Sequence, residues 1–140
     1  MIAYLDSSVI LRIVLGQPGH LREWNRITTG VASGLIEVEC LRTIDRLHLA
    51  GHLTADVAAV RREAVYLVME ALEIVELTNA VLHRAAQPMP APLGTLDAIH
   101  LATADMWRES RGRGTEITFA THDRALSLAA RATGFRVVGV

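Results

Sequence analysis

The sequence has no lysine, one cysteine and few aromatic residues, and each shortage argues against a particular reaction, bond or binding surface. All 14 basic residues are arginines, so reactions that need a lysine are ruled out. Cys40 cannot form an internal disulfide and lacks neighbours at metal-ligand spacing, so we expect a buried helix residue in a reducing, cytoplasmic protein. An aromatic content of 4% argues against a platform for stacking nucleic-acid bases.

Long apolar runs and a basic surplus are also missing. No stretch approaches the ~20 apolar residues of a membrane span, and the N-terminus lacks the charged region of a signal peptide. The net charge of -1 excludes a broad basic surface for nucleic acid, although a local one remains open. With 51% hydrophobic residues in 140, we expect a single domain over 1–140 with a substantial core.

Short apolar segments alternate with helical patterns along the chain. Thr54, Asn79 and Thr95 are predicted to cap helices, as is Ser33. The predicted strands are 2–5, 30–32, 74–77, 117–121 and 135–139; the predicted helices are 7–14, 20–27, 34–49, 55–72, a short one before Pro88, 96–110 and 123–133; and 111–114 is a turn. This alternation predicts an α/β fold with a mostly parallel sheet covered on both faces.

Asp6 and Asp123 each stand where an apolar strand passes into a helix. Ligand sites of parallel sheets lie beyond the carboxyl ends of the strands, so the two carboxylates are expected to share a crevice. Either Asp alone is equally suited to cap its helix. Ser8 and Thr121 are small hydroxyl residues beside them that could take the capping role or support the carboxylates.

Asp97 lies at the start of a segment with almost no other charge, Leu96 to Ala104. Burying a carboxylate among apolar residues is costly unless it is paired or bound to a cation. The helix dipole offsets only about 0.3–1 kcal/mol of that cost. A bound metal ion is the better explanation.

With these residues the chain resembles PIN-domain ribonucleases, in particular the VapC-type toxins of toxin–antitoxin pairs. The four segments that carry the resemblance follow the family's order: Tyr4-Leu5-Asp6-Ser7-Ser8, Ile36-Glu37-Val38-Glu39-Cys40-Leu41-Arg42, Leu96-Asp97-Ala98-Ile99-His100-Leu101-Ala102-Thr103-Ala104 and Ala120-Thr121-His122-Asp123-Arg124. The resemblance implies a three-layer α/β/α PIN-like domain and an acidic set of Asp6, Glu39, Asp97 and Asp123.

Two acidic positions have more than one interpretation. Helical periodicity places Glu37 nearer the apolar side of its helix, whereas the resemblance selects Glu39, so Glu37 stays in reserve. Asp105 departs from the family pattern. It fits a solvated helix face better than a further site carboxylate.

The resemblance implies an endoribonuclease that uses Mg²⁺ or Mn²⁺, a cognate antitoxin and a homodimer, without a membrane partner. We expect Asp6 and Asp97 to bind the first ion directly, and Glu39 and Asp123 to act partly through water or a second ion. The supporting and substrate-binding residues expected around them are Ser8, Thr121, Arg12, Arg42 and Arg124.

Other functions fit less well. Receiver domains need a lysine, haloacid-dehalogenase-like phosphatases need an Asp where Ser8 stands, and no glycine-rich phosphate loop occurs. A DNA-directed or structure-specific PIN nuclease remains open, because carboxylates do not discriminate between sugars. A catalytically weak PIN-like protein that acts by binding also remains open.

Overall fold

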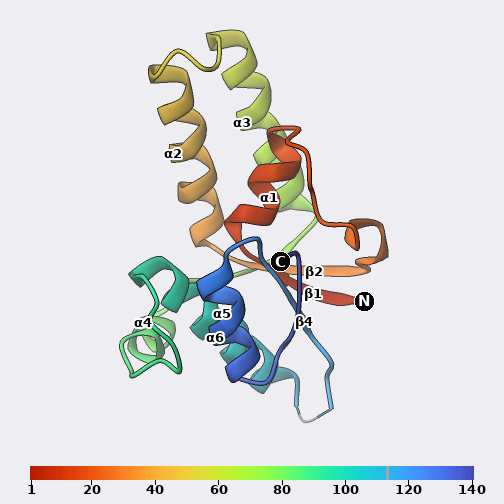
Figure 1. Ribbon diagram of the computed structural model, residues 1–140, viewed down its shortest axis with the longest axis vertical. Coiled ribbons are helices and arrows are strands. Elements are labelled where there is room, and N and C mark those ends of the chain that lie inside the picture. Colours follow the sequence, from red (N-terminus) through yellow and green to blue (C-terminus); the bar gives the residue numbers. More distant parts are fainter. Residues whose placement is uncertain (113) are drawn as a thin grey trace.

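The computed structural model describes residues 1–112 and 114–140, and strands and helices alternate through it as expected (Figure 1). Arg113, part of the predicted turn at 111–114, lies outside the described residues. The elements are β1 (Ile2–Leu5), α1 (Ser7–Val14), the 3₁₀ helix η1 (Trp24–Arg26), β2 (Thr29–Ser33), α2 (Leu35–Leu49), α3 (Ala55–Glu70), β3 (Glu73–Val75), α4 (Asn79–Ala85), α5 (Thr95–Arg111), β4 (Thr118–Ala120), α6 (Arg124–Ala132) and β5 (Arg136–Val138). None of the helices described is long and apolar enough to cross a membrane.

The strands form one sheet in the order β3-β2-β1-β4-β5, and every pair in it is parallel. The chain moves from β1 outward to β3 and then returns to the other side of β1 as β4. The order therefore reverses between β1 and β4, and this switch point is where parallel sheets open a crevice. Asp6 and Asp123 follow these two strands, as the sequence indicated.

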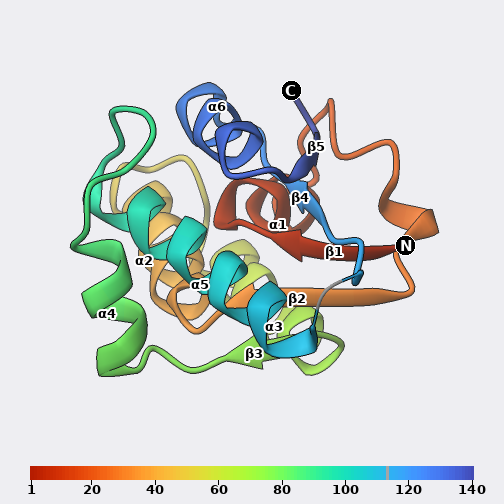
Figure 2. The same cartoon turned by 90° about the horizontal axis from the view of Figure 1, so that it is seen from below.

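Helices cover both faces of the sheet, which confirms the three-layer α/β/α prediction. Because side chains alternate along a strand, Ala3 and Leu5 pack in the cluster with α1, α2 and α3, whereas Tyr4 packs with α5 and α6. Figure 1 shows α1 to α3 on one side of the sheet and α4 to α6 on the other. Figure 2 shows α4 beside α5, which it contacts through Val81 and Ile99.

One helix prediction was wrong. The segment at 20–27 forms only the short η1, since a run of this length gains little from helix formation without a packed face. The helix α3 forms as predicted and has one solvent-facing apolar side: Val60 and Leu67 are 61% and 60% exposed, while Ala58 and Val65 are buried. Apolar residues lie on two sides of α3, so periodicity alone did not identify the side that packs.

Capping was predicted correctly at Thr54, whose side chain accepts a hydrogen bond from the Val57 N–H. The cap of α4 is Thr78, one residue before the predicted Asn79. Gly94 precedes α5 without a side-chain cap, so Thr95 is already helical. Ser33 accepts a hydrogen bond from the Leu35 N–H, although Gly34 occupies the capping position.

Candidate functional site

Asp6 is a helix cap and a buried site residue at once. Its side chain is at the end of β1 and only 3% exposed. Oδ1 accepts hydrogen bonds from the backbone N–H groups of Ser8 (2.9 Å) and Val9 (3.2 Å), and from the Ser8 hydroxyl (2.6 Å). Oδ2 accepts one from the Thr121 hydroxyl at 2.6 Å. The carboxylate is therefore fixed in place, and Oδ2 keeps a lone pair.

The two hydroxyl residues brace the ends of β1 and β4 against each other. The Thr121 hydroxyl, donating to Asp6, accepts the Asp123 N–H at 2.9 Å. The Ser8 hydroxyl accepts the His122 N–H at 2.9 Å. The aspartates themselves act as the caps, since Asp123 Oδ1 accepts the Leu126 N–H at 2.8 Å. The hydroxyls thus support the carboxylates, one of the two roles the sequence left open.

Glu39, and not Glu37, faces this site. The Glu39 side chain is 16% exposed, and its Oε2 lies 2.7 Å from Nε2 of buried His100 on α5. Glu37 is exposed and accepts a 3.3 Å hydrogen bond from Tyr66 on α3. The periodicity that favoured Glu37 was misleading, because the polar partner of Glu39 lies on a distant helix.

Asp97 lies in the first turn of α5 and is partly buried. Burial raises the pKa of this carboxyl above its usual value, and the charges of Asp123, Asp6 and Glu39 raise it further. His100 opposes the shift. Carboxylates from α2 and from the ends of β1 and β4 thus act on Asp97 of α5. We call Asp6, Glu39, Asp97 and Asp123 the acidic site.

The acidic site has the chemistry of a hard-cation site without a closed cage. Over residues 1–112 and 114–140, no three His, Cys, Asp or Glu side chains are arranged to hold a metal ion together. Mg²⁺ commonly uses one or two carboxylates and keeps several waters, so an open set of oxygen donors suits it. The like charges that raise the pKa of Asp97 are what a cation would neutralise. The donor set therefore fits Mg²⁺ or Mn²⁺.

Asp105 lies outside the acidic site. It is roughly 12 Å along α5 from Asp97, at 1.5 Å per residue. Its carboxylate accepts hydrogen bonds from Arg84 (2.7 Å) and Arg108 (2.5 Å). Neither a solvated helix face nor a further site carboxylate describes Asp105: its side chain is only 20% exposed and belongs to an ion-pair cluster.

A groove of about 400 Å³ opens beside the acidic site, between α1 and α2. Its lining includes Glu39, Arg42 and Arg46, with an apolar part at Leu11 and Leu96. Arg42 is exposed and pairs with Asp45 at 2.7 Å. We call this the α1–α2 groove. The sequence had singled out Arg42 but gave no indication of the groove, which three helices form together.

The other expected substrate-binding residues, Arg12 and Arg124, do not line the α1–α2 groove. Arg12 donates to the Gly19 carbonyl at 3.1 Å, and so supports the loop after α1. Arg124 is exposed at the start of α6, directly after Asp123. Trp107 is buried and donates to Glu73 at 2.8 Å, so it offers no face for a base.

His122 contributes its backbone, and its ring turns away. Nδ1 lies 2.6 Å from the Gly139 carbonyl in the C-terminal segment. Gly139 has φ +101°, and a side chain there would collide with the Thr121 carbonyl, so glycine allows the close approach. The His122 ring therefore contacts the C-terminal segment, while its backbone N–H contacts Ser8.

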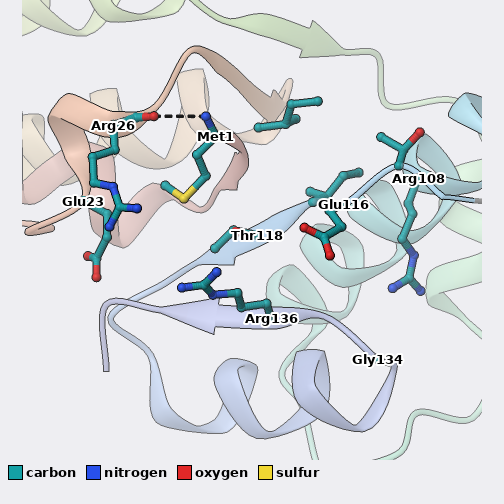
Figure 3. Close-up of a pocket in the computed structure, with 11 residues that line it drawn as sticks. Met1, Glu23, Arg26, Arg108, Glu116, Thr118, Gly134 and Arg136 are labelled. Carbon is teal, nitrogen blue, oxygen red and sulfur yellow. Dashed lines mark hydrogen bonds between the residues drawn. The ribbon is translucent and has the colours of Figure 1, made fainter.

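A second cleft, of about 440 Å³, lies at the amino ends of strands β1, β4 and β5, whereas Asp6 and Asp123 follow the carboxyl ends of β1 and β4 (Figure 3). It has arginines at 26, 108 and 136 and glutamates at 23 and 116. Arg108 is already engaged, donating to Asp105 and to the Thr133 carbonyl. We call this the amino-edge cleft. Its mixed charges contrast with the acidic site, where all four groups have one sign.

Known proteins resemble this chain in sequence and in fold. A model of the PIN domain family matches residues 3–132. This chain belongs to the PIN-domain family. Ribonuclease VapC47 of Mycobacterium tuberculosis is 30% identical over 140 aligned residues, covering 94% of this chain and 92% of that protein. The chain is thus a PIN-domain protein similar to the VapC proteins.

Solved structures have the same PIN fold at lower sequence identity. The structure of FitAB bound to an IR36 DNA fragment superimposes with a TM-score of 0.70 at 18% identity, covering 98% of this chain and 93% of that one. A toxin–antitoxin complex from Klebsiella pneumoniae gives 0.64 at 15% identity, covering 89% and 90%. These likenesses confirm the fold expected from the sequence.

Proposed function

We propose that this PIN-domain protein is a Mg²⁺- or Mn²⁺-dependent endoribonuclease and the toxin of a toxin–antitoxin pair. The observation that carries the proposal is the convergence of four carboxylates at the switch point of a parallel sheet. Burial raises the pKa of Asp97, and the charges of Asp123, Asp6 and Glu39 raise it further. A fold gains no stability from like charges held together, so the arrangement points to a bound cation.

Within the acidic site, Asp6 and Asp97 are the proposed direct ligands. Asp6 is fixed by four hydrogen bonds and keeps a lone pair on Oδ2. Asp97 is a partly buried carboxyl whose pKa is raised by burial and by the neighbouring carboxylates. Glu39 and Asp123 would act through bound water or with a second ion. A divalent cation supplies a Lewis acid and lowers the pKa of its bound water.

Ser8 and Thr121 fix the position of the Asp6 carboxylate relative to the end of β4. Each hydroxyl donates to Asp6 from one side and accepts a backbone N–H at the end of β4 from the other. Because both ends of each link are fixed, the carboxylates need little rearrangement when a cation binds. Such preorganisation lowers the cost of binding.

RNA would be held next to the acidic site by arginines. The α1–α2 groove brings Arg42 and Arg46 to the same hollow as Glu39, and guanidinium groups bind phosphate well. Arg124, exposed beside Asp123, is the proposed contact on the other side. Arg12 is a further proposed RNA contact, although its guanidinium donates to the Gly19 carbonyl in this structure.

Relatives support the wider biological proposal. The relative VapC47 bears the name ribonuclease, and one structure of the same fold is a toxin–antitoxin complex. We therefore propose a cognate antitoxin that covers the acidic site, a homodimer, and action in the cytoplasm, where RNA is available.

The test is cleavage of a structured RNA by the purified protein with Mg²⁺, with Mn²⁺ and with EDTA. We expect cleavage with either ion, none with EDTA, and none by Asp6→Asn with either ion. A DNA strand of the same sequence is the matched substrate control. Cleavage of DNA alone would replace the ribonuclease proposal with a DNA-directed one. Cation-dependent RNA binding without cleavage would instead indicate a binding protein.

A further inference from the structure

The buried imidazole of His100 uses both ring nitrogens. Nδ1 lies 2.9 Å from the Tyr4 hydroxyl on β1, and Nε2 lies 2.7 Å from Glu39 Oε2 on α2. His100 itself is on α5 and only 1% exposed. Three elements that are distant in sequence are thus linked by one ring. The proposed chemistry of the acidic site makes no use of His100 or Tyr4.

One tautomer satisfies all three groups. An ionised Glu39 can only accept, so Nε2 must carry the proton that it donates. The neutral ring then accepts at Nδ1 from the Tyr4 hydroxyl.

This arrangement excludes other roles for the ring. With Nε2 donating to Glu39 and Nδ1 accepting from Tyr4, no lone pair is left to bind a cation. Burial keeps the ring from a solvent water molecule that it could activate. What the ring can do is fix the rotamer of Glu39, whose long side chain is otherwise free to turn toward the α1–α2 groove.

We propose that His100, held by Tyr4, is a positioning residue that directs Glu39 into the acidic site. This inference rests on the proposed function and deepens it. It also explains why Glu39 and not Glu37 serves, since Glu37 has only an exposed, 3.3 Å contact with Tyr66. Groups that orient a ligating carboxylate contribute about 10- to 100-fold to metal affinity or activity.

The test is a double-mutant cycle read by Mn²⁺ affinity and by RNA cleavage. We expect His100→Leu to weaken Mn²⁺ binding by roughly 10-fold or more, and to add almost nothing in a Glu39→Gln background. His100→Gln, which keeps an N–H donor near Nε2, should recover most of the affinity. Glu37→Gln is the matched control and should bind Mn²⁺ as the wild type does.

Equal losses of affinity from His100→Leu in both backgrounds would overturn the proposal, as would wild-type affinity in that variant. A folding defect in His100→Leu would be visible by thermal unfolding, and Tyr4→Phe then replaces it as the milder test. We expect Tyr4→Phe to weaken Mn²⁺ binding by about 3-fold or more through Glu39 alone. Loss in the Glu39→Gln background too would contradict this.

Imidazole ¹⁵N NMR of the wild type gives a readout without metal. We expect a ring protonated at Nε2 and an unprotonated Nδ1 for His100, with the Nδ1 shift altered in Tyr4→Phe. A ring protonated only at Nδ1 would overturn the proposal. Failure of the ribonuclease proposal is distinguishable, because the wild type would then bind Mn²⁺ and respond to His100→Leu without cleaving RNA.

Discussion

Helix α5 carries an aspartate near each end, and the charges around the two aspartates are of opposite sign. At its start, burial raises the pKa of Asp97, and the charges of Asp123, Asp6 and Glu39 raise it further. Near its other end, Asp105 is paired with Arg84 and Arg108. Arg84 also pairs with Glu109 at 2.8 Å, which lowers the pKa of that carboxyl.

The difference separates stability from function within one helix. Paired charges connect α5 to α4 and to the segment before β5, where Arg108 also stacks over Phe135 at 3.9 Å. At the start of α5, the charges around Asp97 have the same sign as its own, so they do not pair with it. We therefore expect neutralising Asp97 to cost activity, and neutralising Asp105 to cost stability.

The largest expected effect is on RNA cleavage by Asp97→Asn. Losing the several kcal/mol that a bound cation supplies corresponds to about 10³-fold in rate. Asp105→Asn makes the same chemical change on the same helix and should stay within about 3-fold of wild type. Equal activity of the two variants in a Mn²⁺ assay would end the distinction between the two ends of α5.

The pKa of Cys40 on α2 is sensitive to the negative charge of the acidic site. Burial raises its pKa to about 12, with added contributions from Glu39 and Asp6. Because the thiolate is the reactive form, we expect alkylation by iodoacetamide at pH 8 to be more than about 100-fold slower in the folded protein than in urea. Comparable rates in the two states would show that the thiol is neither buried nor near the carboxylates.

A smaller effect is expected on the stability of Asp105→Asn. Partly exposed ion pairs contribute little, so the loss of contacts to Arg84 and Arg108 should lower the free energy of unfolding by about 1 kcal/mol. Urea unfolding of metal-free protein measures this. A variant as stable as wild type would mean that the ion-pair cluster does not hold α5 in place.

The smallest effect concerns pH and metal-free stability. The pKa of Asp97 is higher in the folded than in the unfolded protein, so the folded state holds the proton more tightly. The contribution of Asp97 to stability is therefore full below its unfolded pKa of about 3.9, and is lost as pH rises through the folded pKa.

Asp97→Asn should remove this loss and raise the Tm at pH 7 by about 2 °C without metal, a shift expected for less than 1 kcal/mol in a domain of this size. Thermal unfolding at pH 4 and pH 7 measures it. A Tm below wild type at pH 7 would contradict uncompensated charge at Asp97.

Much of the site could be predicted from local sequence, and the exceptions share one cause. Asp6 and Asp123 follow from strands that pass into helices, and Asp97 from its apolar surroundings. Glu39 could not be chosen by periodicity, because its partner His100 lies 61 positions away on another helix. The side of α3 that packs could not be predicted for the same reason, because it is decided by contacts with α1 and α2.

The most direct test is a Mn²⁺ titration of wild type, Asp97→Asn and Asp105→Asn, followed by electron paramagnetic resonance. If the start of α5 belongs to a cation site, wild type and Asp105→Asn bind Mn²⁺ with the same affinity. Asp97→Asn then binds at least about 10-fold more weakly. Equal affinity in all three proteins would contradict the assignment of the acidic site as the centre of function.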